Sequence, residues 1–332
     1  MEKVKKYTGY ILFWVIFALL LSVLSGIFTP KNNSTLAGVS ERDWKPMGAI
    51  AEERDRVDVL ILGDSIVLTG VSPLDIWNQQ GITSYVAGQS GQKVVESYYW
   101  LEEIYPKQTP ELVILEVNAL YNGEGAVAEM DYSLGELVEH YIPLAHYHDR
   151  WKNLTKADLT EEPVYTEIDV TKGFKVKTGT DPYLGGDYME DNEMSGEIDP
   201  AAELYLKKLT SFCKSHGIEL LLLSVPSPQS WNNERHDAVA EYADAHGLPY
   251  LDLNQMTEEV GIDWSEDTMD AGLHLNYTGS MKVSEYLGSY IAGQYPLTDH
   301  RGDPVYWAWD ENYKQYQTGL PEEIRTENKS NS

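Results

Sequence analysis

The stretch VDVLILGDS, residues 57–65, decides the fold of this chain. Five of its first six residues are apolar, which is typical of a strand buried on both faces of a parallel sheet. Two similar runs follow, LVILEV at residues 112–117 and IELLLLSV at residues 218–225. Shorter apolar segments at residues 83–87 and 250–253 complete a set of five candidate strands.

Segments with helical spacing of apolar residues alternate with these strands. They lie at residues 93–105, 201–216, 234–246 and 277–292. Two of them end at a glycine, a common residue just past the end of a helix. Strands that alternate with helices predict an α/β fold, with a mainly parallel five-stranded sheet and helices on both faces.

The N-terminal residues have the composition of a membrane anchor. Lys3, Lys5 and Lys6 precede residues 7–28, which contain no charge. About 20 apolar residues suffice to cross a bilayer as a helix. Basic residues before the span place the N-terminus inside, so we expect a single-pass protein of the cell membrane with its body outside the cytoplasm. A cleaved signal peptide is the alternative, since residues 22–26 offer small side chains to a peptidase.

The composition excludes several classes of function. The chain has 332 residues, 25 Lys plus Arg and 53 Asp plus Glu, so its formal net charge is −28. This acidity argues against a nucleic-acid partner, which requires clustered basic residues. The single cysteine, Cys213, rules out an internal disulfide and a CxxC-type zinc site. His140, His146 and His148 lie close together, but with Asp149 as the one nearby carboxylate at ligand spacing they do not predict a metal site.

Changes in composition suggest the following domain organisation. Residues 1–30 form a cytoplasmic stub and anchor, residues 31–55 a polar stalk, and residues 56–298 the main domain. Residues 120–200 are an acidic, tyrosine-rich insertion that we expect to pack over the carboxyl ends of the strands. Its aromatic residues either stack on sugar rings or bury the insertion's own core. Residues 299–332 form an aromatic and then polar tail whose end we expect to be disordered.

Residues capable of chemistry lie directly after the strands, where open α/β sheets bind ligands. Ser65 follows the first strand and could expose its hydroxyl, although Asp64 and Ser65 are also favoured helix caps. Asp270 and His274 precede the last helix and could be a base and its orienting partner, or ordinary loop residues.

Two further positions could stabilise an oxyanion. Gly88 follows the second strand and Asn118 the third. The first could donate a backbone N–H and the second its side-chain amide. Each alone is equally well a turn residue. Because the four signals fall at the same sheet edge, they predict one site with Ser65 as its nucleophile.

These motifs resemble those of the SGNH (GDSL-type) hydrolases. GDS at residues 63–65 is similar to the first block of that family, Gly88 to the second and Asn118 to the third. DAGLH at residues 270–274 resembles the fifth block, which normally reads D-x-x-H. The resemblance implies a flavodoxin-like three-layer α/β/α fold and a Ser65–His274–Asp270 triad. It also implies an oxyanion hole from Ser65, Gly88 and Asn118, with no metal and no cofactor.

The sequence departs from the family in two places. The third block lacks the usual Gly and Asp, since it reads Glu116-Val117-Asn118-Ala119, which puts the role of Asn118 in doubt. One extra residue separates Asp270 from His274, so Asp267 is a reserve candidate for the triad acid.

The anchor and the AGQSGQ motif also resemble a narrower group, the DltD and AlgJ/AlgX-type proteins. This likeness implies esterase or O-acyltransferase chemistry on a cell-surface polysaccharide or other acyl ester, beside a membrane-bound O-acyltransferase. One alternative is a non-catalytic protein that keeps the fold and binds glycan or a partner. A plain esterase or lipase is another, and a phosphoester hydrolase fits the acidic composition least.

Overall fold

The computed structural model describes residues 2–34, 38–191 and 193–320. Five strands form one sheet in the order β2-β1-β3-β4-β5, and all its neighbouring strands are parallel. The strands are β1 (Val59–Gly63), β2 (Ser84–Gly88), β3 (Leu112–Glu116), β4 (Glu219–Ser224) and β5 (Tyr250–Asp252). The predicted α/β class with a parallel five-stranded sheet is confirmed. This strand order is the flavodoxin-like one, and its switch point lies between β1 and β3.

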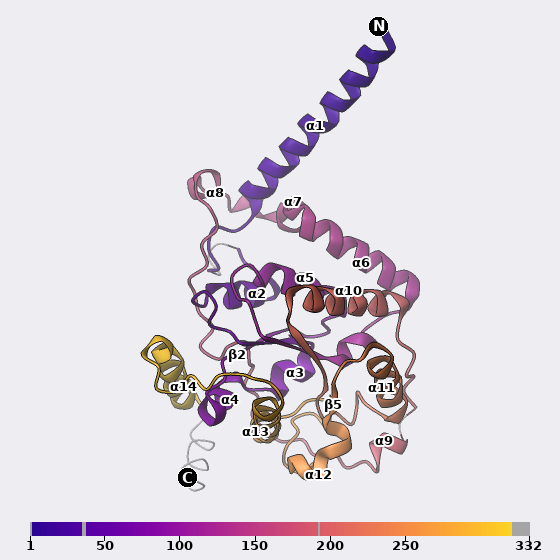
Figure 1. Ribbon diagram of the computed structural model, residues 1–332, viewed down its shortest axis with the longest axis vertical. Coiled ribbons are helices and arrows are strands. Elements are labelled where there is room, and N and C mark those ends of the chain that lie inside the picture. The colour runs from indigo at the N-terminus through magenta and orange to yellow at the C-terminus, as the bar shows by residue number, and fades with distance from the viewer. Residues whose placement is uncertain (1, 35–37, 192, 321–332) are drawn as a thin grey trace.

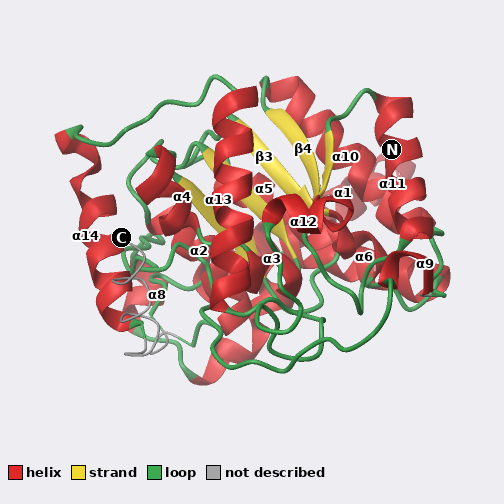
Figure 2. Ribbon diagram, turned by 90° about the horizontal axis from the view of Figure 1, so that it is seen from below, coloured by secondary structure: helices red, strands yellow, loops and turns green. Residues whose placement is uncertain are grey.

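Helices cover both faces of the sheet and make three layers (Figures 1 and 2). One face is covered by α2 (Glu41–Ala51), α5 (Val94–Ile104), α10 (Pro200–His216) and α11 (Asn233–His246). The other is covered by α3 (Ser65–Gly70), α4 (Pro73–Gln80), α12 (Thr257–Val260) and α13 (Tyr277–Gln294). Figure 2 shows α13 crossing in front of the strands.

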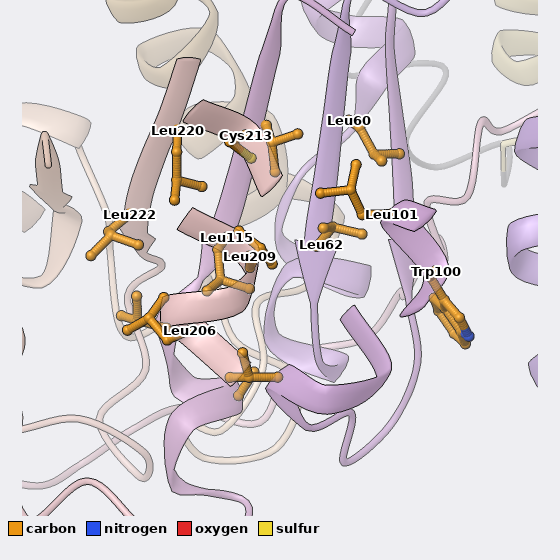
Figure 3. Close-up of a cluster of buried hydrophobic side chains, with 14 of the residues drawn as sticks. Leu60, Leu62, Trp100, Leu101, Leu115, Leu206, Leu209, Cys213, Leu220 and Leu222 are labelled. Atoms are coloured by element: carbon orange, nitrogen blue, oxygen red, sulfur yellow. The ribbon is translucent and has the colours of Figure 1, made fainter. Parts of the chain in front are cut away.

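Alternation of side chains along each strand divides the core between the two faces. Leu60 and Leu62 of β1 point toward α5 and α10, whereas Val59 and Ile61 point toward the α13 side. Figure 3 shows the first of these clusters, where leucines of β1, β3 and β4 meet leucines of α10. Each fully buried leucine contributes about 1.5–3 kcal/mol relative to an exposed one. The core therefore fixes the strand ends from which the site is built.

The predicted stalk is wrong for part of residues 31–55. Helix α2 belongs to the body of the protein, since Met47 and Ala49 are buried and Ala49 is part of the core on the first face of the sheet. The hydroxyl of Tyr85 in β2 donates to the carbonyl of Lys45, 3.2 Å away. The segment resembles a stalk in sequence because only one side of this short helix is apolar and the rest is solvated.

The predicted tail is likewise wrong for its aromatic part. Residues there form η5 (Pro304–Tyr306) and α14 (Trp307–Gly319), which packs on α4. The rings of Trp77 and Trp309 lie 5.6 Å apart, and the Tyr316 hydroxyl donates to Asp75 Oδ2 at 3.0 Å. The aromatic residues are the buried side of a helix. The polar end that we expected to be disordered, from residue 321 on, lies outside the described residues.

Helix α1 (Glu2–Phe28) projects alone from the body of the protein (Figure 1). Its segment Tyr7–Phe28 is long and apolar enough to cross a membrane, a test that a signal sequence also passes. The remaining short elements lie mostly in the insertion. They are η2 (Val117–Tyr121), α6 (Ala126–Tyr141), α7 (Pro143–Tyr147), η3 (His148–Lys152), α8 (Lys156–Thr160), α9 (Tyr188–Asp191) and, outside it, η4 (Leu253–Met256).

The insertion divides into two parts with different positions. Its first part, α6 to α8, lies outside α5 and α10 and next to the base of α1 (Figure 1). Its second part runs past the carboxyl ends of the strands, where the N–H of Lys175 donates to the carbonyl of Leu68 at 2.9 Å and the N–H of Asp181 to that of Thr268 at 3.0 Å. The expectation that the insertion packs over the strand ends is therefore right for the second part only.

Candidate active site

Ser65 lies at the turn between β1 and α3, and its neighbour provides the helix cap. The carboxylate of Asp64 accepts the N–H of Ile66 at 2.9 Å, as an N-cap residue does. A side chain at Gly63 would meet Glu116, since an ideal Cβ there lies 2.6 Å from the Glu116 Cβ. The capping interpretation thus applies to Asp64. The Ser65 hydroxyl is used elsewhere.

His274 connects Ser65 to Asp270. Its Nε2 lies 2.8 Å from the Ser65 Oγ, a residue 209 positions away, and its Nδ1 lies 2.6 Å from Asp270 Oδ2. With Nδ1–H donating to the carboxylate, Nε2 accepts the serine hydroxyl. Ser65 is partly exposed and the His274 side chain is 15% exposed, so both can reach a bound substrate. This arrangement has the geometry of a serine nucleophile, a general base and an orienting acid.

The loop from Asp270 to His274 accommodates its extra residue by a tight bend. Ala271 and Gly272 both adopt left-handed backbone conformations, with φ of 54° and 97°. The bend lets the second oxygen of Asp270 accept the backbone N–H of His274 at 2.6 Å. An Ala in this conformation is strained by about 1–2 kcal/mol, and the hydrogen bond from its N–H to the carbonyl of Asp181 (2.9 Å) holds it there. Four-residue spacing is therefore compatible with a His–Asp pair.

The reserve candidate Asp267 has different partners. Its Oδ2 lies 2.5 Å from the Lys282 Nζ and accepts the N–H of Asp263 at 2.7 Å. Its side chain is 1% exposed. The structure thus pairs Asp270, and not Asp267, with His274.

Gly88 and Asn118 lie against the turn that holds Ser65. A Cβ on Gly88 would come 3.1 Å from the carbonyl oxygen of Gly63 and 3.5 Å from that of Asp64. The backbone at Gly88 therefore lies close to the backbone of the turn. The Asn118 amide donates to Asp64 Oδ2 at 2.7 Å. One N–H of this amide is therefore engaged, and the second is the one that could reach an oxyanion.

Three residues that the sequence analysis did not single out support this edge. The amide of Asn122 donates to Asp64 Oδ2 at 2.8 Å, and Arg235 Nη1 donates to Asn118 Oδ1 at 3.2 Å. Glu116 Oε1 accepts the N–H of Asn118 at 3.1 Å. Burial, together with the nearby charge of Asp64, raises the pKa of Glu116 well above its usual range. Asn122 lies four residues after Asn118, a signal that was available, whereas nothing in the sequence near Arg235 connects it to this edge.

A cavity of about 200 Å³ adjoins the turn. Gly88 and Leu68 line it together with Arg42, Lys45 and Lys175. The cations are partly neutralised by carboxylates, because Lys175 lies 3.5 Å from Glu41, Lys45 lies 3.9 Å from Asp169, and Arg42 lies 2.5 Å from Glu136. The cavity is thus polar and close to neutral.

The three histidines near the end of α6 do not form a metal centre. His146 lies 2.6 Å from both Asp43 and Glu139, and His140 lies 3.4 Å from Glu102 and from Glu103. Within the described parts of the chain, no group of three or more His, Cys, Asp or Glu is arranged to hold a metal ion.

Comparisons with known proteins find similarity in structure alone. No family model and no curated protein matches the chain. Similar solved structures include a lipase/acylhydrolase from Enterococcus faecalis (14% identity, 73% of this chain and 98% of that one, TM-score 0.39). A GDSL-like lipase from Bacteroides thetaiotaomicron VPI-5482 (14%, 71% and 88%, 0.35) and an acetyl xylan esterase (14%, 70% and 99%, 0.37) are also similar.

Proposed function

We propose that this chain is an extracytoplasmic serine-dependent acyl-ester hydrolase or O-acyltransferase. The observation that supports it is the continuous array Ser65 Oγ–His274 Nε2 and His274 Nδ1–Asp270 Oδ2, at 2.8 and 2.6 Å. A surface histidine seldom has a serine hydroxyl on one nitrogen and a carboxylate on the other. The alternative of a non-catalytic binding protein gives no reason for this geometry.

The first half of the reaction forms an acyl-enzyme. Ser65 Oγ attacks the carbonyl carbon of an ester while its proton passes to His274 Nε2, and Asp270 stabilises the resulting imidazolium. The backbone N–H groups of Ser65 and Gly88 and the free N–H of the Asn118 amide stabilise the oxyanion. The bond to the leaving oxygen then breaks, and that oxygen takes the proton from His274.

The second half releases the acyl group. Water or a sugar hydroxyl attacks the acyl carbon, and His274 takes its proton. The bond to Ser65 Oγ breaks and His274 returns the proton to that oxygen. Water as acceptor makes the protein an esterase, and a polysaccharide hydroxyl makes it a transferase.

Support for a cell-surface substrate comes from the N-terminal helix. Three lysines precede the apolar span, which favours an inside N-terminus and a site outside the cytoplasm. This location and the resemblance to DltD and AlgJ/AlgX suggest a substrate and a partner. The substrate would be the acyl groups of a surface glycan, and the partner a membrane-bound O-acyltransferase that acts as a donor.

The test is labelling of the full chain, in detergent micelles, with a fluorophosphonate, together with hydrolysis of p-nitrophenyl acetate. We expect both in the wild type and neither with Ser65→Ala. Ser265→Ala is the matched control. This exposed serine lies five residues before Asp270, and its hydroxyl donates a hydrogen bond to Asp263 and not to His274. A folded wild type that neither labels nor turns over would exclude an autonomous acyl-enzyme mechanism. Added glycerol that becomes acetylated would indicate a transferase.

A further inference from the structure

Helix α6 presents its apolar side to solvent and its polar side to the protein. Its exposed residues, all of which the structure describes, include one charge, Asp131. The other exposed residues are Ala126, Val127, Ala128, Met130, Leu134, Gly135, Val138 and Tyr141. Val127 is 86% exposed and Leu134 is 58% exposed. A surface helix of a soluble domain has the opposite arrangement.

Ion pairs on the inner side of α6 hold this orientation. Glu129 lies 2.5 Å from Lys93 at the start of α5, and Glu136 lies 2.5 Å from Arg42 in α2. The carbonyl of Ser133 accepts the hydroxyl of Tyr205 from α10 at 3.4 Å. Because its polar side chains have these partners, the helix cannot roll over to bury its apolar side without breaking them. The exposed stripe is thus a fixed feature of the fold.

The C-terminal end of α6 lies next to the end of the apolar span of α1. Helix α7 follows α6 directly, and its Leu144 N–H donates to Ser25 Oγ in α1 at 3.2 Å. Arg150 of η3 donates to the carbonyl of Phe28, and the N–H of Val164 donates to the carbonyl of Lys31 at 2.9 Å. The boundary of a bilayer crossed by α1 therefore falls at the level where α6 ends.

The direction of α6 matches the plane of such a bilayer. Figure 1 shows α6 running away from the base of α1, in a direction steeply inclined to the α1 axis. Exposed apolar residues continue around the base, with Trp151 in η3, Leu159 in α8 and Val164 beyond it. The Lys152 ammonium lies 5.3 Å from the centre of the Trp151 ring. Tyrosine and tryptophan are enriched at membrane interfaces, where one side of the ring is apolar and the other is wet.

We propose that α6 lies in the lipid–water interface, with the apolar stripe Val127, Met130, Leu134, Val138 and Tyr141 in the outer part of the bilayer. Such helices bury their apolar side about 5–10 Å into the boundary between headgroups and acyl chains. In this arrangement α1 crosses the bilayer and α6 lies along its surface. The two attachments together fix the rotation of the domain about the α1 axis. The inference requires α1 to stay in the bilayer and is independent of the chemistry of Ser65.

The test uses the full chain in nanodiscs that hold one copy each, with a fluorophore on an introduced cysteine. The native Cys213 is buried, so the unaltered chain provides the unlabelled control. We expect lipids with a nitroxide near the headgroup to quench a label at Leu134→Cys several-fold more than one at Glu258→Cys. Glu258 is exposed on α12, which lies far from α1 (Figure 1). A label at Leu20→Cys in α1 should be quenched best by nitroxides deep in the acyl chains.

A second variant pair tests the stripe itself. With the label at Val138→Cys, changing both Val127 and Met130 to Glu should reduce quenching several-fold, whereas changing Gln255, exposed beside α12 and far from α1, to Glu should not. Equal quenching at Leu134→Cys and Glu258→Cys would overturn the proposal. A different outcome is also informative: no shallow quenching in single-copy discs, but dimers cross-linked through Leu134→Cys in discs that hold several copies. It would overturn the proposal and show that α6 contacts a second copy of the chain instead of lipid. Loss of the α1 label from the bilayer would also overturn it.

Discussion

Two histidines in this molecule have a hydrogen-bond partner at each ring nitrogen. Both have one carboxylate partner, and they differ in the second partner. His274 lies between the carboxylate of Asp270 and the hydroxyl of Ser65, at 2.6 and 2.8 Å. His146 lies between the carboxylates of Glu139 and Asp43, both at 2.6 Å. The first arrangement leaves one nitrogen to accept a proton, and the second requires both nitrogens to donate.

This difference separates the base that we propose, His274, from a structural cation, His146. Burial works against the charged form of His146, but the hydrogen bonds and charges of Asp43 and Glu139 outweigh it and raise its pKa to about 9. His146 is therefore protonated at neutral pH and links α7 to α2 and α6. At His274 a serine takes the place of the second carboxylate, which leaves one ring nitrogen as an acceptor, as the proposed mechanism requires.

The largest effect is expected from a substitution that removes the carboxylate paired with His274. Asp270→Asn leaves the shape of the side chain but favours the wrong tautomer of His274, and we expect turnover of p-nitrophenyl acetate to fall by about 10⁴-fold. Thermal unfolding should change little, since Asp270 is partly exposed. Asp267→Asn is the control. It should lower stability, because Asp267 is buried beside Lys282, while turnover per folded molecule stays near that of the wild type.

The next effect concerns the pH dependence of stability at His146. Its pKa of about 9 in the folded chain exceeds the ordinary value of 6.5, so its contribution is complete below pH 6.5 and is lost as the pH rises through 9. The difference corresponds to stabilisation on the order of 3 kcal/mol. Protection of the α7 amides, meaning the intrinsic exchange rate at each pH divided by the observed rate, should therefore fall between pH 7 and 10. With His146→Gln that fall in protection should disappear, and its persistence would assign the effect to another group.

A smaller effect should follow when one of the two carboxylates at His146 is removed. Glu139→Gln keeps a hydrogen-bond acceptor but removes a charge, so the His146 pKa should fall from about 9 toward 6.5 without reaching it, since Asp43 remains. NMR titration of the ring protons measures this directly. An unchanged pKa would show that Asp43 alone sets it.

The smallest effect is expected from a substitution at Glu116, near the turn that holds Ser65. Burial raises the pKa of Glu116, which favours its neutral form. Because an amide resembles a neutral carboxyl, we expect Glu116→Gln to change stability by less than about 1 kcal/mol. Glu116→Ala removes the acceptor for the Asn118 N–H and should cost more, about 1–3 kcal/mol. Chemical denaturation of both variants distinguishes a neutral Glu116 from a charged one, for which Gln would be as harmful as Ala.

The sheet and the positions of the site residues could be predicted because they depend on short-range patterns. The run at residues 57–62 and its two counterparts are too apolar to lie outside a core, and parallel strands must end at one edge. Ser65 and His274 follow from that geometry. The spacing of Asp270 was ambiguous, because the bend at Ala271 and Gly272 depends on a hydrogen bond to Asp181 in the insertion.

What could not be predicted depends on which side of a helix faces the protein. The apolar residues of α6 have helical spacing, yet a periodic pattern does not say that the apolar side is the exposed one. The ion pairs that decide it come from Lys93 and Arg42, which are distant in sequence. The same reason explains α2 and α14, whose polar surfaces resembled a stalk and a tail until the packing of the other side was known.

The separation between Ser65 and His274 has a consequence for synthesis. A chain made from its N-terminus exposes the nucleophile while its base is still 209 residues from being added. The segment that steadies the base, around Asp181, is made between the two, and helices α13 and α14 come after both. The serine thus remains an ordinary hydroxyl throughout elongation. In the mechanism that we propose, it becomes reactive only when nearly the whole domain has emerged and folded, so an unfinished copy would not attack esters where it is made.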